Sequence, residues 1–80
     1  MVDDYVRRLR SARLALVTLD GELASELGPG YQHSERFRQL HDNTGEAPSV
    51  NEGRLMARYV ALIAEGNKAI EDYEQQKSLH

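Results

Sequence analysis

The stretch from Ser49 to Lys77, SVNEGRLMARYVALIAEGNKAIEDYEQQK, decides the fold that the sequence predicts. It opens with Ser-x-x-Glu, a pattern in which Ser49 and Glu52 each accept a hydrogen bond from the other's backbone N–H at a helix start. Apolar residues then recur at steps of three and four, and no proline interrupts them. This seam consists of Met56, Tyr59, Ile63, Ile70 and Tyr73, widened by Leu55, Leu62 and Ala69. The stretch therefore predicts one long amphipathic helix over residues 50–77.

Gly66 lies on this seam and permits two interpretations. Its missing side chain can let another helix or a large residue approach closely. Alternatively, Gly66 and Asn67 break or bend the helix, since glycine costs about 1 kcal/mol relative to alanine inside a helix. The sequence leaves both open.

Residues 2–27 carry a second seam of the same kind. Its members are Val2, Tyr5, Leu9, Ala12, Leu16, Leu19 and Leu23. The dipeptide Asp20-Gly21 is typical of a β-hairpin turn, but the seam runs through it, so a helix is favoured, with a kink at Gly21 as a further possibility. Gly28-Pro29-Gly30 predicts the end of this helix, because glycine adopts the left-handed conformation of a helix C-cap and proline does not continue a helix.

A shorter helix is predicted over residues 33–43, with Phe37, Leu40 and His41 on one face and Ser34 as a candidate N-cap. Residues 78–80 are expected to form a frayed tail. The chain is thus expected to be a single small helical domain.

In both long helices most of the arginines lie in the first half, and most of the acidic residues lie in the second half. The early cations are Arg7, Arg8, Arg10 and Arg13 in the first helix, and Arg54 and Arg58 in the last. The late acids are Asp20, Glu22 and Glu26 in the first, and Glu65, Glu71, Asp72 and Glu74 in the last. Antiparallel helices would place basic beside acidic segments at both ends, which biases orientation because each exposed ion pair contributes only about 0–1 kcal/mol. We predict an all-α fold: an antiparallel helical hairpin of two long helices, with a short connecting helix that crosses it.

Size favours a partner for this hairpin. A chain of 80 residues buries only about 60% of its unfolded surface, and without cysteine it has no disulfide to add stability. Leu14 and Val17 form a second apolar strip, which either Phe37 and Leu40 or another chain must cover. We favour a homodimer that completes a helical bundle. The residues expected in that interface, whose other possible role is ordinary core, are Leu9, Leu14, Leu16, Val17, Met56, Tyr59, Ile63 and Ile70.

Catalytic and metal-binding patterns are missing from the sequence. His33 and His41 lie eight residues apart without a His-Glu-x-x-His motif, and there is no Gly-x-Ser-x-Gly or phosphate-binding glycine loop. We therefore expect no enzyme activity, no cofactor and no metal.

Charge and hydropathy bear on the partner. The net charge of −3 disfavours bulk electrostatic binding to nucleic acid, and the longest apolar run, residues 59–64, is far too short to span a bilayer. The acidic first residues are unlike a signal peptide, so we expect a cytoplasmic protein without a membrane partner. The predicted function is a protein-interaction module that binds itself or a partner protein through helices, as an adaptor, an inhibitor, an assembly or secretion chaperone, or a phage accessory protein. The alternative is a nucleic-acid-binding regulator that uses Arg7, Arg8, Arg10 and Arg13, with Tyr5 able to stack on a base.

Overall fold

The computed structural model describes residues 2–78 of the chain. They form α1 (Val2–Leu27), the 3-10 turn η1 (Tyr31–His33), α2 (Glu35–Asp42) and α3 (Val50–Ser78). The described residues contain no strand, so the all-α prediction is confirmed. Ser78 is still helical, and the rest of the predicted tail, residues 79–80, lies outside the described residues.

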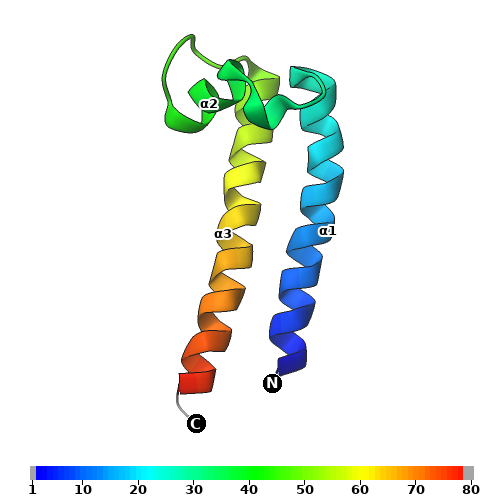
Figure 1. The fold of residues 1–80 in the computed structure, drawn as a ribbon, viewed down its shortest axis with the longest axis vertical. Helices are drawn as coiled ribbons and strands as arrows, with labels where there is room; N and C mark the ends of the chain where they lie inside the picture. The colour runs from blue at the N-terminus through cyan, green and yellow to red at the C-terminus, as the bar shows by residue number, and fades with distance from the viewer. Residues whose placement is uncertain (1, 79–80) are drawn as a thin grey trace.

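The two long helices lie side by side and run in opposite directions, while α2 sits at the end where the chain turns back (Figure 1). Arg8 of α1 pairs with Asp72 of α3 at 3.0 Å, and Arg58 of α3 pairs with Glu22 of α1 at 2.9 Å. The antiparallel charge match predicted from the sequence is therefore present toward both ends of the hairpin. The molecule is long and narrow, with principal extents of 48 × 22 × 21 Å.

The helices begin and end where the capping residues dictate. Gly28 has φ +101° and its N–H donates to the carbonyl of Ala24 at 2.8 Å, which closes α1. The Ser34 hydroxyl accepts a hydrogen bond from the Phe37 N–H at 3.1 Å, so α2 starts at Glu35 and is shorter than the predicted 33–43. At the start of α3, the Glu52 N–H donates to the Ser49 hydroxyl at 3.1 Å and the Ser49 N–H donates to the Glu52 carboxylate at 3.0 Å. The predicted capping box is thus formed.

Both long helices continue through their internal glycines, Gly21 and Gly66. A Cβ atom built on Gly66 would lie 3.7 Å from Cδ1 of Leu9, which is an ordinary van der Waals contact. A Cβ on Gly21 would meet nothing within 4 Å. Of the two interpretations of Gly66, the helix break does not occur, and the glycine lies opposite a leucine of α1.

Replacing Gly66 or Gly21 by alanine is expected to raise the free energy of unfolding by about 1 kcal/mol each, because alanine loses less backbone entropy in a helix and has room at both sites. Gly66→Ala should gain slightly more, through contact with Leu9. Urea unfolding followed by circular dichroism measures both. If Gly66→Ala were destabilising while Gly21→Ala was not, the helices would have to be closer at Gly66 than the 3.7 Å contact indicates.

The hydrophobic core lies at the loop end of the hairpin. Its buried members are Leu19, Leu23, Tyr31, Phe37, Leu55 and Met56. Phe37 is the centre of an aromatic group, with its ring 5.2 Å from that of Tyr31 and 5.5 Å from that of Tyr59, both edge to face. Among residues 2–78, the buried side chains toward the open end are the small ones of Ala12 and Ala69, with Tyr5 and Tyr73 in edge contact at 5.9 Å. The hairpin is therefore well packed at one end and thinly packed at the other.

Candidate protein interface

The seams of α1 and α3 face each other. Each helix therefore contributes one flank to each of the two broad sides of the hairpin. One side carries Arg8, Glu22, Arg58, Lys68 and Asp72, and we call it the charged face. The other carries Val6, Val17, Ile63, Ile70 and Tyr73, and we call it the apolar face. The ion pairs lie on the first side, whereas several large exposed aliphatic side chains lie on the second.

On the charged face, the ions satisfy one another within the chain. Asp72 accepts from Lys68 at 3.1 Å and from Arg8 at 3.0 Å. These two hydrogen-bonded cations, Lys68 first and Arg8 second, hold the pKa of Asp72 below its ordinary value. The pairs are largely exposed, so they orient the helices and contribute little stability.

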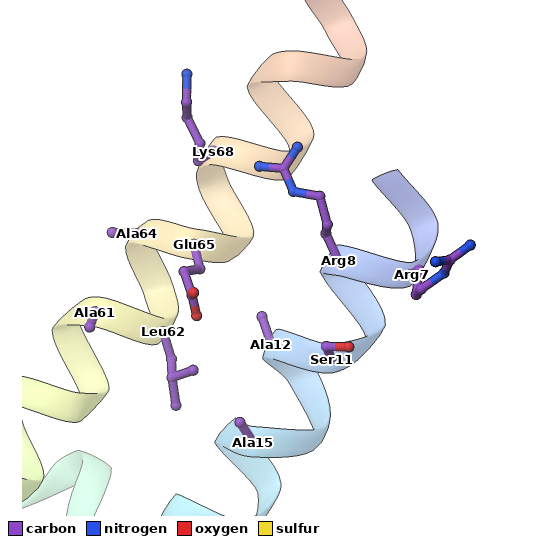
Figure 2. Close-up of a pocket in the computed structure, with 10 residues that line it drawn as sticks. All are labelled: Arg7, Arg8, Ser11, Ala12, Ala15, Ala61, Leu62, Ala64, Glu65 and Lys68. Carbon is purple, nitrogen blue, oxygen red and sulfur yellow. The ribbon is translucent and has the colours of Figure 1, made fainter. Parts of the chain in front are cut away.

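A groove of about 810 Å³ lies on this charged face (Figure 2). Figure 2 shows Arg8 extending from α1 toward α3, whereas Arg7 points away from α3. Four alanines contribute to its lining: Ala12, Ala15, Ala61 and Ala64. Because Arg8 and Lys68 are both engaged by Asp72, this groove offers an incoming anion no free pair of cations.

The apolar face has two smaller grooves, of about 260 and 400 Å³, one after the other along the hairpin. The one toward the open end is lined by Tyr5, Val6, Leu9, Ala69, Ile70 and Tyr73. The one toward the loops is lined by Leu16, Val17, Asp20, Leu23, Tyr31, Gln32, Tyr59 and Ile63. Val17 is 70% exposed and Val6 is 47% exposed, so this face presents large aliphatic side chains to solvent. A row of such side chains along two adjacent helices is a surface that another helix can cover.

Six of the eight residues predicted for an interface line these two grooves. They are Leu9, Leu16, Val17, Tyr59, Ile63 and Ile70. Met56 is instead only 7% exposed and belongs to the core. Leu14 is 64% exposed but lies on the back of α1, two residues and therefore about 200° from the buried Ala12. Phe37 and Leu40 pack at the loop-end core and leave Leu14 and Val17 uncovered, so they do not serve as the intrachain cover.

The four arginines predicted as a possible nucleic-acid contact are divided by the structure. Arg7 pairs with Asp4 at 3.6 Å, and Arg8 is the partner of Asp72. Arg10 and Arg13 are exposed and form no ion pair with any residue between 2 and 78. The cluster is therefore not one continuous patch of free cations.

Arg36 holds the loop end together, a role that the sequence did not reveal. Its guanidinium donates to the two carboxylate oxygens of Glu52 at 2.6 and 3.0 Å, and to the carbonyls of Glu46 and Ala47 at 3.1 and 3.4 Å. The Glu52 side chain is only 15% exposed. The hydrogen bond from Arg36, followed by that from the Ser49 backbone, lowers the pKa of Glu52 from 4.5 to about 2. One carboxylate thus caps α3 and fixes the loop that joins it to α2.

This lowered pKa predicts a dependence of stability on acid. A carboxylate whose pKa is depressed in the folded state stabilises the fold above its unfolded pKa and loses that contribution as pH falls toward the folded value. The wild-type chain should therefore lose about 2 kcal/mol of unfolding free energy between pH 4.5 and pH 2 through Glu52. Glu52→Gln, which keeps a side-chain acceptor but no charge, should be less stable at neutral pH and lack this component. Urea unfolding at several pH values measures the difference, and equal acid sensitivity of both chains would contradict the assignment.

Tyr31 is a second residue whose role the sequence did not indicate. Its ring is buried in the core and its hydroxyl donates to the carboxylate of Asp20. Burial, followed by this hydrogen bond, raises the pKa of Tyr31 above its ordinary value. The contact anchors η1 to the loop end of α1.

Chemical sites of other kinds do not assemble in the described part of the chain. Residues 2–78 bring together no three side chains able to hold a metal ion. His41 lies 3.3 Å from the carboxylate of Asp42, and its ring is 6.4 Å from that of Phe37. Within the same range, no helix is both long enough and apolar enough to cross a membrane. No protein-family model, curated protein or solved structure matches the chain.

Proposed function

We propose that this chain is a protein-interaction module that acts by helix–helix binding, and that the partner on its apolar face is a second copy of the same chain. The observation that carries the proposal is the set of large aliphatic side chains that remain exposed on the apolar face, whereas Arg8, Arg58 and Lys68 on the opposite face are paired with carboxylates of the same chain. A cytoplasmic location remains a prediction from the sequence.

The amount of exposed surface supports the proposal. The chain exposes 5991 Å², whereas a compact monomer of 9.1 kDa is expected to expose about 4,900 Å². The excess of about 1,100 Å² exceeds the roughly 800 Å² that each partner buries in a standard protein interface. The radius of gyration, 15.2 Å, is likewise larger than the about 12 Å expected for a compact domain of 80 residues. Both values fit one half of a bundle better than a complete globule.

A second hairpin is the occupant that suits this face. Two hairpins stacked through their apolar faces form a four-helix bundle, in which each helix has neighbours on two sides and the seams are covered. A two-fold pair uses the same patch on both chains, so one self-complementary face is sufficient. The thin core toward the open end, where Ala12 and Ala69 are the buried side chains among residues 2–78, is where the second copy would add most burial.

The experiment that tests this function is thermal unfolding at two protein concentrations a hundredfold apart. Since a dimer dissociates when it unfolds, its Tm is expected to rise by roughly 5–10 °C over that range. Circular dichroism at 222 nm records the transition, with cuvette path length adjusted to concentration. A Tm that is the same at both concentrations would refute self-association coupled to folding.

Nucleic-acid binding is the second candidate function, and the observation that favours it is the absence of an ion pair at Arg10 and Arg13 within residues 2–78. If this function is correct, a gel shift at low salt should disappear at moderate salt and in the double variant Arg10→Glu with Arg13→Glu. No retardation at low salt would eliminate it.

A further inference from the structure

Two rows of side chains with the same spacing run along the apolar face, one on each helix. Residues four, three and four positions apart lie along one side of a helix, because each step is close to one turn of about 3.6 residues. The α1 row is Val6, Arg10, Arg13 and Val17, and the α3 row is Ile63, Asn67, Ile70 and Glu74. The outer residues of the α1 row are apolar and its centre is cationic, whereas the α3 row has two isoleucines, the neutral polar Asn67 and one acid at its end.

The ion pairs of the charged face set the register between these rows. Arg8 pairs with Asp72, and Glu22 pairs with Arg58, so residues at one level of the hairpin have numbers that add up to about 80. The ring contact of Tyr5 with Tyr73 gives a sum of 78, and the approach of Leu9 to Gly66 gives a sum of 75. Arg10 is therefore level with Ile70 to within about one turn, and Val17 lines the same groove as Ile63.

Three charged residues of the two rows have no ionic partner among residues 2–78 of their own chain. The described residues, 2–78, offer no ion pair to Arg10, Arg13 or Glu74. The cations belong to α1 and the acid to α3. A second copy therefore supplies complementary charge where its α3 lies over α1 of the first copy.

We infer that the second copy lies parallel to the first, with both loop ends together, so that α1 of each chain lies over α3 of the other. This inference rests on the proposed self-association. In this arrangement Val17 faces the partner's Ile63, and Arg10 lies near the partner's Ile70, about one helical turn from the partner's Glu74. α1 of one chain is then antiparallel to α3 of the other, as it is to α3 of its own chain. The same match of basic and acidic segments therefore operates between chains.

The opposite arrangement, with the loop ends at opposite ends, is disfavoured by the same rows. It places α1 over α1 of the partner in the reverse direction, so that the centres of the two α1 rows meet. Arg10 then faces the partner's Arg13, and Arg13 faces the partner's Arg10, which brings four like charges together over an apolar surface. Sliding the chains to separate these charges would uncover Val6 and Val17.

The sequence has no cysteine, so single introduced cysteines report the arrangement directly. Each chain carries one cysteine, two variants are mixed, and a short bis-maleimide joins only thiols on different chains. Val17→Cys mixed with Ile63→Cys should cross-link in the parallel dimer, and Val6→Cys mixed with Val17→Cys should not. Leu14→Cys mixed with Ile63→Cys is the matched control, because Leu14 is as exposed as Val17 but lies on the back of α1.

Charge reversal gives an independent readout. Arg10→Glu alone and Glu74→Arg alone each replace two attractive contacts of the dimer by two repulsive ones, and each should weaken self-association roughly tenfold. An equal mixture of the two variants restores opposite charges at both contacts, so its association should return to the wild-type strength. Sedimentation velocity measures all three samples.

The outcomes separate the arrangement from the proposed function. Cross-linking of Val17→Cys with Ile63→Cys, together with recovery in the mixed charge variants, supports the parallel dimer. A dimer that cross-links through Val6→Cys and Val17→Cys, or through neither pair, overturns the arrangement and leaves self-association intact. Chains that sediment as monomers throughout overturn both.

Discussion

Leu19→Ala is expected to lower the free energy of unfolding by about 3 kcal/mol. Leu19 is fully buried, with 0% of its surface exposed, and belongs to the cluster that joins α1 to Tyr31, Phe37 and α3. Removal of a buried leucine side chain costs the lost transfer free energy and leaves a cavity, which together amount to about 2–5 kcal/mol. A domain of this length has a total stability of about 4–12 kcal/mol, so this one change removes a large share of it.

The matched control for this prediction is Leu14→Ala on the same helix. Leu14 is 64% exposed, so the same chemical change should alter the free energy of unfolding by less than about 0.5 kcal/mol. Urea unfolding at one fixed protein concentration gives both values. If the two variants lost similar amounts of stability, the loop-end cluster would not be the core of the fold.

Val17→Asp is expected to weaken self-association by about a hundredfold while the hairpin stays folded. Val17 is 70% exposed in the single chain, so a carboxylate there remains in water. In the dimer the same carboxylate would be covered by the partner's α3 at two symmetric positions, and the loss of apolar contact together with desolvation of the charge costs about 3 kcal/mol. Sedimentation velocity measures the association, and circular dichroism confirms the helix content.

Leu14→Asp distinguishes the apolar face from general effects of charge on α1. It places the same side chain at a similarly exposed position, with the same cost in helix propensity, on the back of the helix. Its association should match the wild-type chain. Equal weakening by both variants, or by neither, would show that the apolar face is not the interface.

The helices were predictable because each has local signals at its ends. Ser49 with Glu52 fixes the start of α3, and Gly28 fixes the end of α1, in the way that capping chemistry requires. The orientation followed from charge order, since only antiparallel helices place Arg8 beside Asp72 and Arg58 beside Glu22. Gly66 was undecided, because a glycine alone does not tell whether its neighbours compensate for its low helix propensity.

The side-chain contacts across the loop end could not be predicted from the sequence. Arg36 reaches Glu52 over 16 residues, and Tyr31 reaches Asp20 over 11, through a path that depends on how η1 and α2 fold back. Nothing in the spacing of these residues marks them as partners. Each also has an ordinary local interpretation, such as the helix cap that Glu52 forms with Ser49.

Only part of the candidate interface could be predicted, because the packing of the helices is not visible in the sequence. Periodicity identifies apolar residues on a helix, but the rotation of that helix against its neighbours decides which of them are covered. Val17 and Leu14 are both off the main seam of α1, yet Val17 borders the apolar face and Leu14 lies behind it. Met56 belongs to the predicted seam of α3 and is covered by the core at the α2 end.

The mass of the wild-type chain in solution tests the central claim most directly. Multi-angle light scattering of the eluting peak, from low to high micromolar concentration, measures this mass without a label or a substitution. Association through the apolar face predicts twice the chain mass of 9.1 kDa. A peak that keeps the mass of 9.1 kDa up to the highest concentration would contradict the claim that a second copy covers this face.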